Sequence, residues 1–274
     1  MKKGINLWCF EESTSAADAI RLAKQAGFDS VELNLEEPDL HADGLERFKR
    51  LRDVARSEGI ILSSVSTNLH WKYPLTDPNS STRQKGLDIV RRQIEAAQII
   101  GADAVLVVPG RVTETDAYDQ VFERAQESIA TVLLDAKSAE VAIGLENVWN
   151  RFLLSPLEFR AFIDGFQSPW VRVYFDVGNV VVSGYPEQWI RILGQRIVRV
   201  HVKDFVRDAG NYFGFVHLLE GDVAWPAVVQ ALQEVGYDGF VSAEIPPYPH
   251  GWFPNAGVAQ ISRAMDLILG SCRG

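Results

Sequence analysis

Three carboxylates and one imidazole stand at the ends of short apolar runs in this chain: Glu146, Asp176, His201 and Glu244. If these side chains meet in one pocket, their negative charges repel one another unless a cation lies between them. A ligand set of mostly oxygens with one imidazole suits Mn²⁺ first, with Mg²⁺, Co²⁺ or Zn²⁺ as alternatives. The residue types therefore predict one bound divalent metal ion.

Each of the four residues also has an ordinary structural explanation. A carboxylate at a strand end often caps the next helix, and a lone histidine in a strand is often a hydrogen-bonded core residue. Four such residues on four consecutive strands, all at the same end, are much harder to explain by capping. The metal-site interpretation is preferred, and it requires elements that bring these strand ends together.

Those elements alternate along the chain, because short runs rich in β-branched residues are followed by longer segments with helical periodicity. We predict eight strands, at Gly4–Trp8, Ser30–Asn34, Ile60–Ser66, Ala104–Val108, Ala142–Glu146, Val171–Phe175, Val198–Val202 and Phe240–Glu244. Four helices are clear, at residues 15–26, 43–58, 81–100 and 224–235, and a glycine follows each one. Such a glycine can take the left-handed conformation that ends a helix.

Strict alternation favours parallel strands joined by crossover helices, and eight units suit a closed (β/α)8 TIM barrel. The 274 residues are typical of one such barrel, so we predict a single domain over residues 1–274. A doubly wound sheet is the main alternative, but it would need a glycine fingerprint where the sequence reads Trp8-Cys9-Phe10. The longest connections, at residues 69–80, 205–223 and 245–255, would lie over the carboxyl-end mouth of the barrel, where active sites form.

Charge and composition exclude several classes of protein. The net charge is −9, which makes nucleic acid a poor partner but leaves a small anionic substrate open. The expected absence of a signal peptide and of a membrane span favours a cytoplasmic protein.

The segments that carry a family resemblance are residues 23–32, 64–110, Asp176-Val177-Gly178-Asn179, residues 200–204 and Glu220-Gly221-Asp222. Through them the chain resembles the xylose-isomerase-like barrel superfamily of sugar isomerases and epimerases, over nearly its whole length. The resemblance is closest to L-ribulose-5-phosphate (L-xylulose-5-phosphate) 3-epimerases, with ketose 3-epimerases of the tagatose/psicose type as a sister group. It implies a homodimer or homotetramer that acts on a small sugar or sugar phosphate.

The resemblance also implies roles for individual residues. Glu146, Asp176, His201 and Glu244 would hold the metal, and Glu146 and Glu244 would be the catalytic acid/base pair. One glutamate would remove a proton beside the carbonyl, and the other would return a proton to the opposite face through a metal-stabilised cis-enediolate. Asn179 occupies a position where the free-ketose enzymes carry histidine and the phosphate-sugar epimerases carry asparagine.

Other activities remain open on the same scaffold, because a fold does not determine a function. Aldose–ketose isomerisation, hydroxypyruvate isomerisation and inosose-type dehydration would use the same four ligands. A DNA repair endonuclease would need more metal ligands than five histidines readily supply, and a basic surface. A sugar-binding module without catalysis is the non-enzymatic alternative.

Five residues near the expected mouth are candidates for substrate binding: Trp8, His70, Asn179, Lys203 and Arg207. Arginine and lysine would suit a substrate phosphate, and further cationic candidates are Lys72, Arg111 and Arg151. Aromatic residues that could wall the pocket, or simply pack, are Trp8, Phe10, Trp149, Phe213 and Trp252.

Overall fold

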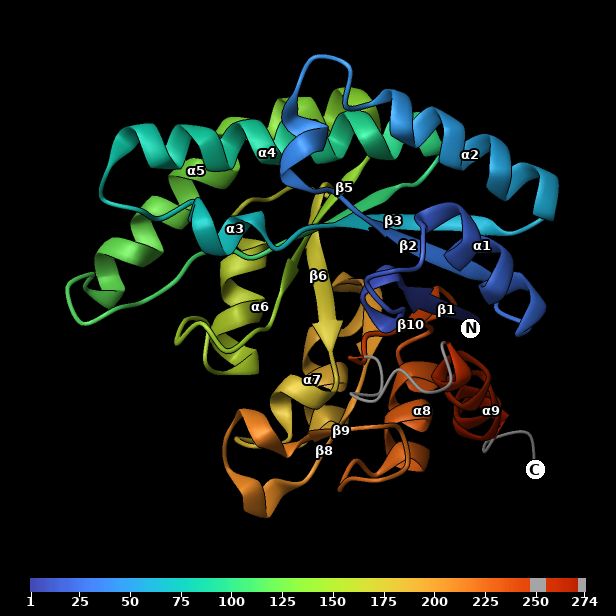
Figure 1. Ribbon diagram of the computed structural model, residues 1–274. Coiled ribbons are helices and arrows are strands. Elements are labelled where there is room, and N and C mark those ends of the chain that lie inside the picture. The colour runs from blue at the N-terminus through green and yellow to red at the C-terminus, as the bar shows by residue number, and fades with distance from the viewer. Residues whose placement is uncertain (247–254, 271–274) are drawn as a thin grey trace.

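A computed structural model describes residues 1–246 and 255–270 of the chain. Eight parallel strands close into a barrel in the order β1-β10-β7-β6-β5-β4-β3-β2, with helices around it (Figure 1). The barrel strands are β1 (Lys2–Asn6), β2 (Ser30–Asn34), β3 (Ile61–Ser66), β4 (Ala104–Val107), β5 (Ala142–Glu146), β6 (Val171–Asp176), β7 (Ile197–Val202) and β10 (Phe240–Ala243). The predicted single (β/α)8 barrel is confirmed.

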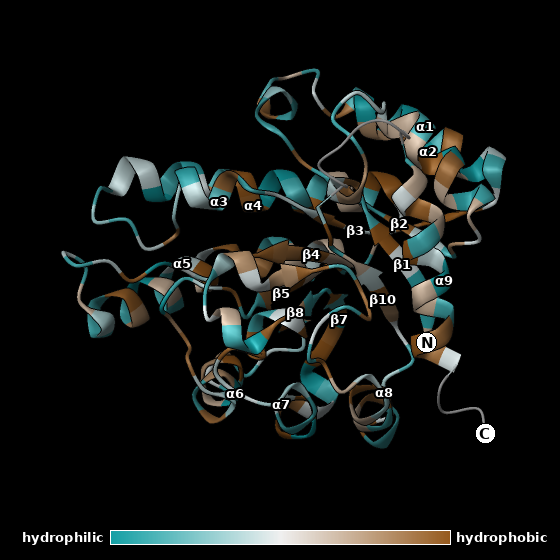
Figure 2. Ribbon diagram, turned by 60° about the horizontal axis from the view of Figure 1, so that its bottom comes forward, coloured by the Kyte–Doolittle hydropathy of each residue, from teal (hydrophilic) through white to brown (hydrophobic). Residues whose placement is uncertain are grey.

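The larger helices are α1 (Ala16–Gln25), α2 (Glu46–Glu58), α4 (Ser80–Ile100), α5 (Tyr118–Ala139), α6 (Pro156–Asp164), α7 (Pro186–Leu193), α8 (Trp225–Glu234) and α9 (Ala256–Gly270). In Figure 2 the barrel strands are mostly hydrophobic, whereas the helices mix hydrophobic and hydrophilic residues along their length. The four predicted helices are present with small shifts in their ends. Gly59 and Gly101 end α2 and α4 in the left-handed conformation, with φ of 65° and 77°.

The first strand differs from its prediction. It ends at Asn6, and Trp8 lies instead in the short 3-10 helix η1 (Leu7–Cys9). The side-chain oxygen of Asn6 accepts a hydrogen bond from the backbone N–H of Trp8 at 2.7 Å, which turns the chain out of the strand. This turn carries Trp8 over the mouth of the barrel.

Strand register decides which side chains can meet at the mouth. Asp176 on β6 is paired in register with His201 on β7. Glu244 follows β10 directly, and its backbone N–H still donates to the carbonyl of Val202 at 3.1 Å. Glu146 is the last residue of β5. Because β5, β6, β7 and β10 are neighbours in the barrel, all four residues lie at the same end of adjacent strands.

The connection from β7 to α8 carries a two-stranded antiparallel sheet, β8 (Asp204–Phe205) and β9 (Phe215–Val216). Asp204 is fully buried, and its carboxylate accepts hydrogen bonds from the backbone of Leu219 and Val223 and from the indole of Trp225. This carboxylate fixes the loop over the barrel mouth. Within the described residues, none of the helices combines the length and apolarity that crossing a membrane requires.

Candidate functional site

The predicted metal ligands meet at the carboxyl-end mouth of the barrel. One ligand atom from each of Glu146, Asp176, His201 and Glu244 lies within 4.8 Å of all the others. Asp176 and His201 are fully buried, Glu146 is nearly so, and the side chain of Glu244 is 17% exposed. Three carboxylates that lie this close together and are this deeply buried require compensating positive charge.

The two ring nitrogens of His201 differ in their contacts. Its Nε2 lies 3.1 Å from both carboxylate oxygens of Glu32. Its Nδ1 has no hydrogen-bond partner among the described residues, and it lies 3.8 Å from Glu146 Oε1 and 3.6 Å from Glu244 Oε2. A buried polar atom without a partner is costly, and a carboxylate on the far ring nitrogen is the usual support of a metal-binding histidine. The four side chains therefore fit a divalent cation.

Glu32 was not predicted as a site residue, although it organises the centre of the barrel. It is fully buried in the middle of β2 and accepts hydrogen bonds from Asn6 Nδ2 at 2.7 Å, from the Ser64 hydroxyl at 2.9 Å and from the Tyr174 hydroxyl. Burial raises the pKa of Glu32, but His201 and these donors outweigh it and lower the pKa to about 2. Glu32 is thus a fixed negative charge behind His201.

Lys203 supplies a positive charge at the edge of the cluster. Its Nζ donates to Asp176 Oδ2 at 2.7 Å and to Glu244 Oε2. Burial lowers the pKa of Lys203, but the carboxylates of Asp176 and Glu244 outweigh that effect and raise it. The lysine therefore stays charged and bridges two of the acids.

The two glutamates of the cluster have opposite pKa shifts. Burial, reinforced by the charge of Glu244, raises the pKa of Glu146 to about 7, although the neighbouring imidazole of His201 opposes this. Burial also raises the pKa of Glu244, but the charges of Lys203 and His201 outweigh it and lower the value. A pair of carboxyls with divergent pKa values is the usual arrangement of an acid and a base that share one substrate.

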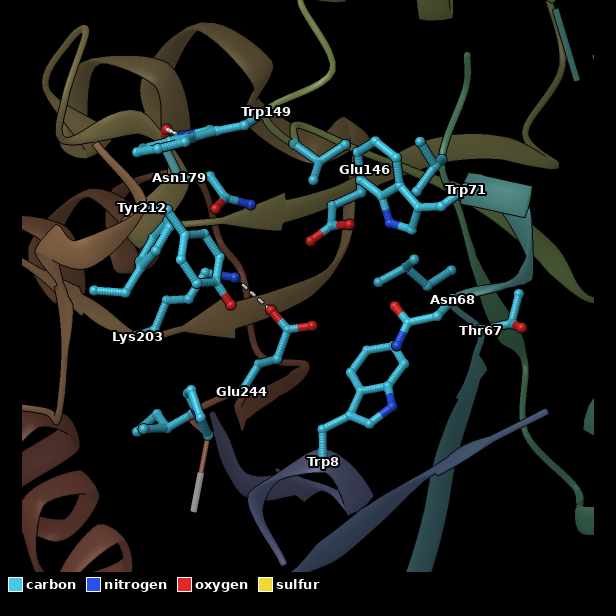
Figure 3. Close-up of a pocket in the computed structure, with 16 residues that line it drawn as sticks. Trp8, Thr67, Asn68, Trp71, Glu146, Trp149, Asn179, Lys203, Tyr212 and Glu244 are labelled. Carbon is cyan, nitrogen blue, oxygen red and sulfur yellow. Dashed lines mark hydrogen bonds and ion pairs between the residues drawn. The ribbon is translucent and has the colours of Figure 1, made fainter. Parts of the chain in front are cut away.

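A cavity of about 580 Å³ opens above the cluster. Figure 3 shows Glu146 and Glu244 facing its interior, with Trp8 and Trp71 on one side and Trp149 and Tyr212 on the other. Of the predicted substrate-binding residues, Trp8, Asn179 and Lys203 line this cavity. Trp149 is held in the wall by a hydrogen bond of 2.9 Å from its indole to the carbonyl of Asn179.

Two other substrate-binding candidates do not line the cavity. His70 lies in the short helix α3 (Leu69–Lys72), buried, with its Nε2 3.0 Å from Gln93 Oε1. Arg207 lies in the 3-10 helix η5 (Arg207–Ala209), and its guanidinium stacks over Tyr185 at 5.0 Å from the ring centroid. Both side chains are engaged by the protein itself, His70 as a core residue and Arg207 at the surface.

The remaining aromatic and cationic candidates that the structure describes do not gather at the main cavity. Phe10 is buried, whereas Phe213 is 88% exposed. Lys72 binds Glu37, with oxygen contacts of 2.7 and 2.9 Å. Arg151 lines a neighbouring cavity, Arg111 lines neither of these two cavities, and Trp252 lies outside the described residues.

Comparison with known proteins agrees with this architecture. The family described as xylose isomerase-like TIM barrel matches residues 20–268. The L-ribulose-5-phosphate 3-epimerase UlaE of Salmonella paratyphi A is 27% identical over 279 residues, which cover 98% of this chain and 95% of that protein.

Two solved structures share the fold, each with a TM-score of 0.81. One is a D-psicose 3-epimerase determined in the presence of D-fructose, which is 17% identical and aligns over 98% of this chain and all of that chain. The other is an L-ribulose 3-epimerase, which is 22% identical and aligns over 99% of this chain and 95% of that chain.

Proposed function

Because the chain belongs to the xylose isomerase-like TIM barrel family, we propose that it is a metal-dependent epimerase that inverts the carbon beside the carbonyl of a small ketose or ketose phosphate. The observation that carries the proposal is the pair Glu146 and Glu244, which face one cavity from one cluster and have opposite pKa shifts. The curated relative named as an L-ribulose-5-phosphate 3-epimerase supports the same class of reaction.

The metal would be held by Glu146, Asp176, His201 and Glu244, and Mn²⁺ is the first choice for such a set. A divalent cation bound there would act as a Lewis acid on the sugar carbonyl and stabilise the negative charge that forms when the adjacent C–H bond breaks. Glu32 would keep His201 in the tautomer that offers Nδ1 as a ligand.

The protein groups would move the proton. The carboxylate of Glu244, with its lowered pKa, accepts the proton from the carbon beside the carbonyl. Glu146, whose pKa is raised to about 7, delivers a proton to the opposite face of that carbon. The roles exchange in the reverse reaction. Trp8 and Trp71 on one side and Trp149 on the other would exclude water and hold the apolar faces of the sugar.

The test is solvent deuterium exchange into a panel of ketoses and ketose phosphates, followed by NMR in the presence of Mn²⁺. We expect deuterium at C3 together with the C3 epimer. Glu146→Gln and Glu244→Gln should each reduce turnover at least about 10³-fold, because each removes a proton carrier. Glu127→Gln, at an exposed position on α5, is the matched control and should keep full activity.

The same spectra separate the alternatives. Deuterium at C1 or C2 with formation of an aldose would indicate an aldose–ketose isomerase, and loss of water would indicate a dehydratase. Near-normal turnover by either glutamate variant in saturating Mn²⁺ would refute the two-glutamate scheme. Unchanged sugar with tight, metal-independent binding would favour a sugar-binding module.

A further inference from the structure

The charged side chains that line the described part of the cavity all belong to the metal cluster or contact it. They are Glu146, Glu244 and Lys203. Lys203 is therefore the only cation in this lining, and its ammonium group is already held by Asp176 and Glu244. Its side chain is only 13% exposed. The described lining thus contains no lysine or arginine apart from Lys203, which is held at the metal cluster.

Two other cations near the mouth, Lys72 and Arg207, are engaged by neighbouring side chains. Lys72 is paired with Glu37, and Arg207 stacks on Tyr185. Arg151 lines a separate cavity of about 410 Å³, whose only lining residues shared with the main cavity are Val148, Trp149 and Asn179.

The rest of the lining is suited to a neutral polyol. Five aromatic residues contribute to it: Trp8, Trp71, Trp149, Tyr212 and Phe215. Aromatic faces carry a negative quadrupole, so they attract the C–H faces of a sugar but not a phosphate of charge about −1.5 to −2. Thr67 and Asn68 supply uncharged polar atoms for hydroxyl groups.

Asn179 adds no positive charge to the lining of the cavity, although it matches the phosphate-sugar epimerases in sequence. Its side-chain amide donates to the carbonyl of Asn147 at 3.0 Å, and its backbone N–H donates to Asp176 Oδ1 at 2.8 Å. It carries no charge, and these two hydrogen bonds tie it to the protein. Asn179 therefore shapes the wall without providing a phosphate site.

We propose that the substrate of this site is an unphosphorylated ketose, in contrast to the phosphorylated sugar for which the curated relative is named. This inference rests on the proposed epimerase function and narrows it to one class of substrate. The aromatic walls hold the carbon chain of the neutral sugar, and the two glutamates face the carbon beside its carbonyl.

The test compares each ketose with its own terminal phosphate, for example L-ribulose with L-ribulose 5-phosphate, on the Mn²⁺-loaded enzyme. We expect kcat/KM for the free ketose to exceed that for the phosphate at least about 10-fold. The value for the free ketose should change less than about twofold between 50 and 300 mM salt, because a neutral substrate is not screened. A higher kcat/KM for the phosphate overturns the inference while leaving the epimerase proposal intact.

Binding of the same pairs, measured by calorimetry, separates this inference from the proposed function. Binding of free ketose without C3 exchange would refute the epimerase proposal and support the substrate class. Tighter binding of the phosphate, or no binding of either sugar, would overturn the substrate class.

Lys72→Met, Arg151→Gln and Arg207→Gln should leave the ratio of the two kcat/KM values within about twofold. A selective loss of phosphate turnover in any of these variants would reveal a phosphate site and contradict the inference.

Discussion

His201 and Glu32 are joined so that the imidazole presents a single free nitrogen to the mouth of the barrel. Nε2 lies 3.1 Å from both oxygens of the fully buried Glu32 carboxylate, and Nδ1 faces Glu146 and Glu244. The carboxylate fixes both the orientation and the tautomer of the ring. A residue from the second strand of the barrel thereby orients one candidate ligand, His201 on β7.

We predict that Glu32→Gln weakens Mn²⁺ binding about 10- to 100-fold, because the amide supports the imidazole less strongly than a carboxylate does. The dissociation constant is measured by calorimetry on the metal-free protein. Ser64→Ala is the matched control, because Ser64 also contacts Glu32 but not His201; it should change the constant less than about threefold. Equal Mn²⁺ affinity in Glu32→Gln and wild type would show that Glu32 is structural only.

Metal binding should release protons and weaken as the pH falls. Burial lowers the pKa of His201, but Glu32 and Glu244 raise it well above its ordinary value, and that of Glu146 is raised to about 7. His201 must lose a proton to become a ligand, and a neutral Glu146 is a weaker ligand than a carboxylate, so protons compete with the metal increasingly as the pH falls. Calorimetry in buffers of different ionisation enthalpy should show at least one proton released per Mn²⁺ at pH 6.5. Affinity that does not change between pH 6 and 8 would contradict this expectation.

The sequence allowed the barrel and the four ligand positions to be predicted, because both depend on local patterns. Apolar runs of strand length alternate with helical periods, and Glu146, Asp176 and Glu244 each stand directly after such a run. Closure of the barrel then brings these ends together, as the separation of at most 4.8 Å among the ligand atoms confirms. Their roles in binding and catalysis remain predictions.

Residues whose environment depends on distant contacts could not be predicted in the same way. Glu32 lies within a strand and was not singled out from the sequence, but all of β2 is buried and closure of the barrel brings Glu32 against His201. His70 is predicted in a connection at the mouth as a substrate-binding candidate, but that segment forms α3 and the His70 ring is buried against Gln93 of α4. A charged residue inside a short apolar run was the one available signal for Glu32.

Lys203→Met should destabilise the metal-free protein by about 3 kcal/mol, because it removes the cation that compensates Asp176 and Glu244. Saturating Mn²⁺ should raise the Tm of the variant more than that of the wild type, since the metal neutralises the same carboxylates. The control is Lys72→Met, which breaks an exposed ion pair and should cost less than about 0.5 kcal/mol. Thermal unfolding with and without Mn²⁺ measures both effects, and equal metal-induced shifts in wild type and Lys203→Met would refute the assigned role of Lys203.

His70 should make the stability of the protein depend on pH in a defined window. Burial lowers the pKa of His70 to about 4, while its hydrogen bond with Gln93 opposes the shift only in part. Between about pH 6.5 and 4 the unfolded chain binds the His70 proton and the native state does not, so stability falls as the pH falls through that range. The loss is about 3 kcal/mol over the window relative to His70→Asn, which cannot titrate there. Urea unfolding of both proteins from pH 7.5 to 4.5 measures the difference in slope. Parallel curves for the two proteins would mean that His70 is protonated in the native state, and that its place in the core is not that of a neutral imidazole.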